Sequence, residues 1–198
     1  DLLLELVRAY QRLGNVQGMS YAWSLGRTDE ALASYEQALL LLGRLDAGWA
    51  DRPEALRERA AVLEGLGSLR AARGDTLGAI GRHREAASAL ERLAAIAPHL
   101  DLREERYTNR LDTGDALWEV GQVPGAVAEY EEALRLVAAW TAATPGEARF
   151  RHWEGVLAQR LGDALALDGR WGEALVRQQR SLALDEALAQ EHPDDGAK

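Results

Sequence analysis

LGDALALDGRWGEALVRQQRSL, residues Leu161–Leu182, is the stretch that decides the fold. Its apolar and small residues recur every three or four positions on both sides of Gly169, which predicts two helices joined by a tight turn. Gly162 lies on one face of the first helix and Ala174 on one face of the second. Small residues at such positions allow two antiparallel helix axes to approach closely. The stretch therefore predicts a helical hairpin that is closed by small residues.

The same arrangement occurs three more times upstream. In two of these copies, as in the first stretch, the second Gly follows the first by seven residues and the Ala follows it by twelve. These copies carry Gly67, Gly74 and Ala79, and Gly114, Gly121 and Ala126. A fourth copy with Gly14, Gly26 and Ala31 has five extra residues before its turn, and successive Ala positions are 48, 47 and 48 residues apart. A period of this size predicts a stacked array in which each unit buries its apolar face against its neighbours.

The repeated skeleton resembles the tetratricopeptide repeat, with a large residue expected four positions after the Ala. Those positions hold Tyr35, His83, Tyr130 and Gln178. The resemblance implies an all-α protein, a right-handed α-solenoid of about four long helix-turn-helix repeats and about eight helices. It places the repeats at about 1–48, 49–97, 98–144 and 145–192, with a polar tail at 193–198. The usual period is about 34 residues, so both helices of each repeat are expected to carry extra turns.

The opening segment has a narrower likeness. Leu13–Gly18, the insert up to Tyr21 and Ala22, then Leu25–Thr28 and Ala31 with Leu32 look like the long-period arrays attached to the C-terminal side of bacterial serine/threonine protein kinases. This resemblance implies a role in bacterial signalling, in which the array recruits substrates or partners to a kinase or mediates its self-association. Because the amphipathic pattern is already under way at Asp1, we expect the chain to be a piece of a longer protein.

Composition restricts the classes of partner. The 198 residues carry 23 basic and 32 acidic side chains, a formal net charge of −9. Nucleic acid and anionic membrane surfaces require a basic stripe, so neither is expected as a partner, whereas a basic or neutral protein or peptide segment is. Cys is absent and no apolar run approaches the length of a membrane span. We therefore expect a cytoplasmic location.

Three first helices are predicted to begin with the same capping box, in which a small polar side chain and an acid three residues later satisfy free N–H groups. The pairs are Asp51 with Glu54, Asp101 with Glu104, and Thr144 with Glu147. Asp75 is predicted to cap the second helix of the second repeat, and Thr28 and Asp29 that of the first.

No constellation of residues points to catalysis. The four histidines are dispersed, none lies at metal-ligand spacing, and no phosphate-binding loop occurs, so we expect a non-catalytic segment without cofactor or metal. His83 occupies a position that requires a large residue, which favours a packed core side chain. An enzymatic site assembled across repeats stays open as an alternative.

The expected function is that of a protein-interaction scaffold. In tetratricopeptide repeats the first helix of each pair lines the concave face, and the resemblance carries this role to ten positions, although each could also be an ordinary solvent-facing residue. They are Arg8, Gln11, Asn15, Glu64, Ser68, Thr108, Leu111, Asp115, Gln159 and Asp163. Tyr21 and Trp23 in the insert either bind a partner or fold back over the first helix pair. The alternative function is structural self-association, in which the last helix stacks on another copy of the chain.

Overall fold

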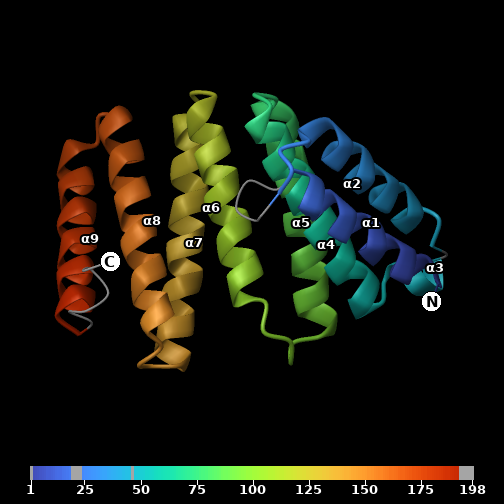
Figure 1. Cartoon of the computed structure of the whole chain (residues 1–198). Helices are drawn as coiled ribbons and strands as arrows, with labels where there is room; N and C mark the ends of the chain where they lie inside the picture. The colour runs from blue at the N-terminus through green and yellow to red at the C-terminus, as the bar shows by residue number, and fades with distance from the viewer. Residues whose placement is uncertain (1, 19–23, 46, 192–198) are drawn as a thin grey trace. The chain divides into compact units, whose positions relative to one another are not determined.

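The computed structural model describes residues 2–18, 24–45 and 47–191, and all regular secondary structure in these ranges is helical (Figure 1). The all-α prediction is confirmed for this part of the chain. The helices are α1 (Leu2–Gly18), α2 (Thr28–Leu42), α3 (Ala47–Ala50), α4 (Pro53–Ala72), α5 (Thr76–Ile96), α6 (Arg103–Glu119), α7 (Val123–Ala143), α8 (Ala148–Leu167) and α9 (Trp171–Glu191). The eight long helices match the expected number. The one-turn helix α3 is an addition, because α2 ends at Leu42 and the chain forms another turn before α4.

The first compact unit extends to Ala116 and contains α1 to α5 and most of α6. Within it α1 packs on α2, α4 packs on α5, and α2 packs on α4. One core cluster joins Val7, Tyr35 and Leu66, all at most 1% exposed. Burial of such side chains contributes roughly 1.5–3 kcal/mol each and is the main source of stability in a helical pair.

The second compact unit begins at Leu117 and contains α7, α8 and α9. Here α7 packs on α8, and α8 packs on α9. Trp140 of α7 and Phe150 and Trp153 of α8 form an aromatic cluster whose ring centroids lie 5.4–6.2 Å apart. Phe150 is fully buried. Trp140 and Trp153 therefore serve packing.

The turns between paired helices agree with the sequence analysis. Gly74, Gly121 and Gly169 all have φ between 75° and 79°, a conformation that side chains disfavour. After each glycine the next backbone N–H donates to a carbonyl five residues earlier, which is the Schellman arrangement for ending a helix. These donors are Asp75, Gln122 and Arg170, each at 2.9 Å. The repeated glycine thus ends the first helix and starts the turn in three successive copies.

The predicted capping boxes of α4 and α8 are wrong. The N-cap residues of α4 and α8 are Arg52 and Glu147, and neither makes a side-chain capping bond. Thr144 instead ends α7 and donates to its own helix at the Trp140 carbonyl. Asp101 accepts from the Arg103 N–H at 3.2 Å, one residue outside the expected register.

The caps of the second helices differ from one another. Asp75 does cap α5, because its Oδ1 accepts a hydrogen bond from the Gly78 N–H at 3.1 Å. For α2 the predicted cap is wrong, since Arg27 holds the N-cap position and Thr28 is already helical. Local polar residues therefore predicted where helices start to within a few positions but not which atoms satisfy the free N–H groups.

The helix pairs inside each unit agree with the proposed hairpins, whereas a single right-handed solenoid of four repeats over residues 1–192 stays a prediction. None of the helices in the described ranges combines the length and apolarity that a bilayer-crossing segment needs.

Candidate functional site

A single tyrosine connects the first two predicted repeats. Tyr35 lies on α2, is 1% exposed, and donates its hydroxyl hydrogen to Oδ1 of Asn15 on α1. A Cβ atom added at Gly14 would lie 2.6 Å from the Tyr35 ring, and one added at Gly65 on α4 would lie 2.7 Å from its hydroxyl oxygen and closer still to two ring carbons. Contacts this short do not occur between real side chains, so both glycines are required for the ring to fit.

The corresponding side chain of the second repeat is His83, and its surroundings are polar. His83 lies on α5, is 2% exposed, and packs against Gly67 of α4. Its Nδ1 atom lies 2.8 Å from Oε2 of Glu64, also on α4. Asn109 of α6 donates from Nδ2 to the other Glu64 oxygen and, at 2.7 Å, to the backbone carbonyl of His83. The buried imidazole is therefore paired with Glu64 of its own repeat, and Asn109 of the next repeat holds that carboxylate and the His83 backbone carbonyl.

Asp112 of α6 completes this cluster. Burial raises the pKa of Asp112 to about 6, the charge of His83 acts against this rise, and the charges of Glu64 and Asp115 add to it. Burial lowers the pKa of His83, but the hydrogen bond and charge of Glu64, together with Asp112, outweigh it and raise this pKa above its ordinary value. We call Glu64, His83, Asn109 and Asp112 the polar cluster. It brings two carboxylates and one imidazole together between three helices.

Asp112 and Gly65 occupy equivalent positions in successive copies, each two residues before the Gly of the first helix. Tyr35 of the first repeat is followed by Gly65 at this position in the second repeat. His83 of the second repeat is followed by Asp112 at this position in the third repeat. At these two junctions the residue in the successor differs with the projecting side chain, whereas at the third Tyr130 is followed by Arg160 at the equivalent position.

Several predicted binding residues of the first unit make structural contacts. Arg8 Nε donates to Glu58 on α4 at 2.6 Å, and its Nη1 donates to Glu5 at 2.8 Å. Asn15 accepts the hydrogen bond from Tyr35, and Glu64 belongs to the polar cluster. Gln11, Ser68, Leu111 and Asp115 are half-buried, and Thr108 is exposed. The structure therefore joins Arg8, Asn15 and Glu64 to neighbouring helices and leaves Thr108 open to solvent.

The other two predicted positions lie on α8 in the second unit. Gln178 Nε2 donates to Oδ1 of Asp163 at 2.7 Å and more weakly to the Gln159 carbonyl at 3.4 Å. A Cβ atom at Gly162 would lie 2.8 Å from Gln178 Nε2, so Gln178 takes the place of the aromatic ring against the small residue. The Gln159 side chain is exposed. Tyr21 and Trp23 lie outside the described residues.

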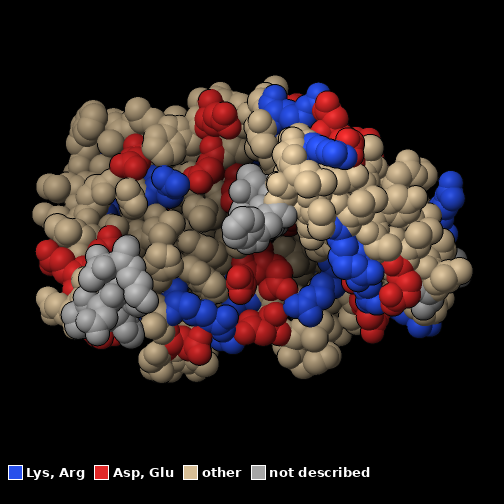
Figure 2. All heavy atoms as spheres, in the orientation of Figure 1, with Lys and Arg blue, Asp and Glu red and all other residues tan. Residues whose placement is uncertain are grey.

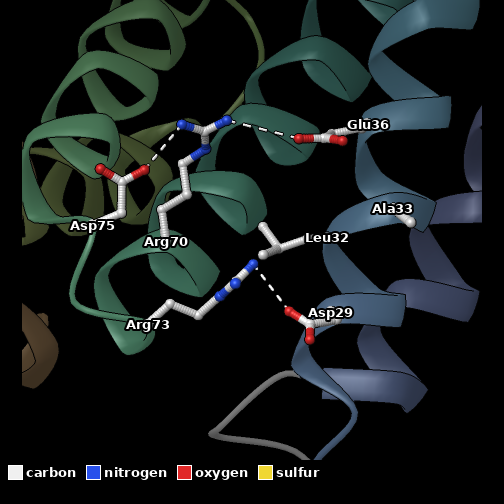
Figure 3. Close-up of a pocket in the computed structure, with 7 residues that line it drawn as sticks. All are labelled: Asp29, Leu32, Ala33, Glu36, Arg70, Arg73 and Asp75. Atoms are coloured by element: carbon white, nitrogen blue, oxygen red, sulfur yellow. Dashed lines mark hydrogen bonds and ion pairs between the residues drawn. The ribbon is translucent and has the colours of Figure 1, made fainter.

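A polar hollow of about 450 Å³ lies between α2, the end of α4 and the start of α5 (Figure 3). Its two guanidinium groups point toward acids on its walls: Arg73 pairs with Asp29 at 2.9 Å, and Arg70 pairs with Asp75 at 3.1 Å and with Glu36 at 3.7 Å. Because these charges face one another across the hollow, it offers no concentration of one sign for a charged ligand. Figure 2 likewise shows acidic and basic groups close together on the face in view.

Comparison with protein families agrees with the first of these helix pairs. Residues 7–41 match the tetratricopeptide repeat. The matched segment covers most of α1 and α2, the pair that holds Tyr35. The narrower likeness to kinase-associated arrays receives no support from this match.

The chain also resembles two solved structures at low identity. The crystal structure of MamA is 18% identical, with a TM-score of 0.47 over 83% of this chain and 92% of that one. The crystal structure of nearly identical TPR-like repeats from Podosopora anserina is 19% identical, with a TM-score of 0.39 over 94% of this chain and 95% of that one. No curated protein matches the chain.

The polar cluster was not predicted from the sequence because its members are far apart in the chain. The burial of His83 confirms the prediction of a packed side chain, but its polar partner was not predicted. One signal was present: of the four positions three residues before the first-helix Gly, only Glu64 is acidic, and it occurs in the copy with His83. A buried imidazole in place of a tyrosine requires a polar partner, and Glu64 was the candidate.

Proposed function

We propose that the chain is a non-catalytic scaffold that binds a peptide or protein segment along the face formed by its first helices. The observation that carries the proposal is the presence of paired helices closed by small residues, with the first pair matching the tetratricopeptide repeat. Repeats of this kind generally mediate protein–protein interaction. The net charge of −9 favours a basic or neutral segment over an acidic one.

Thr108 provides the test, because it is exposed on the expected binding face of α6. Thr108→Arg introduces bulk and positive charge there. Ser88→Arg is the matched control, since Ser88 is an exposed hydroxyl residue on the second helix α5. We expect the wild type to bind members of an array of basic, neutral and acidic peptides with a preference for basic ones. Thr108→Arg should weaken binding of the basic peptides by about tenfold or more, because like charges across an interface repel.

If Thr108→Arg and Ser88→Arg change peptide binding equally, the binding face is not formed by the first helices. If the wild type captures no peptide, the proposed scaffold function is wrong. Reversal of the half-buried acids Asp115 and Asp163 extends the test to both units, since a charge-based preference should then fall or invert.

We also propose that the parent protein is bacterial and cytoplasmic and carries a serine/threonine kinase domain. The support is the resemblance of the opening segment, residues 13–32, to kinase-associated arrays. The full-length reading frame tests this directly: a kinase catalytic domain in it supports the proposal, and a frame without one removes it.

Self-association is a second candidate function, favoured by the outer side of α9. Trp171 is 70% exposed, and Leu175 and Leu182 are each 60% exposed. Their spacing of four and seven residues places them on one helical stripe. Burial of that stripe against a second copy would remove it from water.

The molar mass in solution distinguishes this candidate from the peptide scaffold. We expect light scattering to show a mass that rises with protein concentration, and the double variant Leu175→Glu, Leu182→Glu to abolish the rise. Leu77→Glu on α5 is the control, because Leu77 is 67% exposed outside this stripe. A monomer at all concentrations would refute self-association and leave the peptide scaffold unaffected.

A further inference from the structure

Three metal-ligating side chains from three different helices converge in the first unit. Glu64 of α4, His83 of α5 and Asp112 of α6 each offer one ligand atom, and these atoms all lie within 4.8 Å of one another. A metal ion at the centre of such a triangle can reach all three with small side-chain movements. We propose that Glu64, His83 and Asp112 bind a divalent transition-metal ion of the zinc class.

The donor set fits that class of ion. One imidazole nitrogen and two carboxylate oxygens are ligands that Zn²⁺ accepts at about 2.0–2.2 Å, and three protein ligands leave a coordination position for water. Mg²⁺ and Ca²⁺ prefer oxygen-only sites, so the imidazole selects against them. The chain contains no Cys that could compete for a soft ion.

The three ligands are held by rigid elements. Each lies within a long helix, away from its ends: α4 spans Pro53–Ala72, α5 spans Thr76–Ile96 and α6 spans Arg103–Glu119. Asn109 fixes the second oxygen of Glu64 by donating to it, and the same amide donates to the His83 carbonyl at 2.7 Å. Hydrogen bonds of this kind to ligands orient a metal site and raise its affinity.

Charge also favours a cation at this position. Asp112 is half-buried, and the negative charges of Glu64 and Asp115 act on it against the opposing charge of His83. A divalent ion would neutralise the two negative charges of the carboxylate ligands, whereas the imidazole supplies at most one positive charge. The Glu64 side chain is 22% exposed, so an ion can enter from its side of the cluster.

This inference revises the expectation from the sequence that the chain binds no metal. That expectation rested on the lack of ligand motifs such as closely spaced histidines. Here each ligand comes from a separate helix, and only the packing of α4, α5 and α6 brings them together.

The test measures zinc binding to the full chain after treatment with EDTA and dialysis. Calorimetric titration with ZnCl₂ at pH 7.5 should give one ion per chain, and Co²⁺ should produce visible d–d absorption bands from the same site. Asp112→Asn should weaken zinc binding by about tenfold or more, because it removes an anionic ligand. MgCl₂ at millimolar concentration should give no binding.

Two control variants distinguish this site from other histidines. His152→Gln changes an exposed histidine on α8 and should leave zinc affinity unchanged. His192→Gln changes the histidine that follows Glu191 in the sequence and should also leave zinc affinity unchanged. His83→Gln should abolish binding. If that variant does not fold, as judged by circular dichroism, Asp112→Asn still decides the outcome, since it retains the size of the side chain.

The proposal is overturned if the wild type binds no zinc at about 100 µM, well above the range of structural zinc sites. It is equally overturned if Asp112→Asn binds zinc as tightly as the wild type, or if His192→Gln removes the binding. These outcomes are independent of peptide binding, so the scaffold function can stand or fall separately.

Discussion

Gly65→Ala is the sharpest test of how the first two repeats fit together. The new methyl group would lie 2.7 Å from the Tyr35 hydroxyl oxygen and closer still to the ring. Tyr35 is 1% exposed and hydrogen-bonded to Asn15, so the ring can move aside only by opening the core and losing that bond. Overpacking of this kind costs about 1–3 kcal/mol. Replacing a glycine inside a helix with Ala returns up to about 1 kcal/mol of helix propensity. We expect a net loss of about 1–2 kcal/mol in the free energy of unfolding.

Gly81→Ala is the matched control. Gly81 also lies inside a helix, α5, but a Cβ atom there meets nothing within 4 Å. Only the propensity term then applies, so this variant should be more stable than the wild type by about 0.5–1 kcal/mol. Urea unfolding followed by far-ultraviolet circular dichroism measures both. A Gly65→Ala variant as stable as the wild type would refute the close fit of Tyr35, and a destabilised Gly81→Ala would refute the propensity argument.

Three further predictions concern single side chains. Asp75→Ala should lower stability by about 1 kcal/mol in urea unfolding, because it removes the only side-chain cap found at α5. Phe150→Ala should lower it by about 3–5 kcal/mol in the same assay, since a fully buried ring is lost from the aromatic cluster; a loss below 1 kcal/mol would contradict that packing. In EDTA, the pKa of Asp112, about 6, means that the folded protein holds this proton more tightly than the unfolded chain. The stability that this group contributes is therefore complete below about pH 4 and is lost as the pH rises through 6. Between pH 5 and pH 8 the urea midpoint should fall less in Asp112→Asn than in the wild type. Equal falls in the two proteins would contradict the assignment of this pH dependence to Asp112.

The parts of the fold that the sequence predicted depend on local chemistry. Gly74, Gly121 and Gly169 predicted the turns because a left-handed backbone strongly favours glycine. The small residues of the first helices predicted where helices approach, and the contacts of Gly67 with His83 and of Gly162 with Gln178 confirm this.

The parts that it missed depend on partners distant in the chain. Asp51 suits an N-cap by composition, but its carboxylate pairs with Arg92 of α5 and does not cap α4. Thr144 was interpreted as the start of a helix, yet it ends the preceding one. The polar cluster depends on Asn109, which no local pattern connected with His83. Propensity identifies a residue that can make a bond but not which of several nearby groups it will choose.

The match between a projecting side chain and the following repeat also limits how the copies could be rearranged. If the segment that carries Asp112 were joined directly after the segment that carries Tyr35, a charged carboxylate would replace Gly65 against a buried aromatic ring. In the reverse exchange, His83 would keep Glu64 but lose Asn109, which donates to that carboxylate and to the His83 backbone carbonyl. Exchanging copies across these two junctions should therefore lower stability unless both sides are transferred together, so for this part of the chain the building block for engineering is the junction between two hairpins.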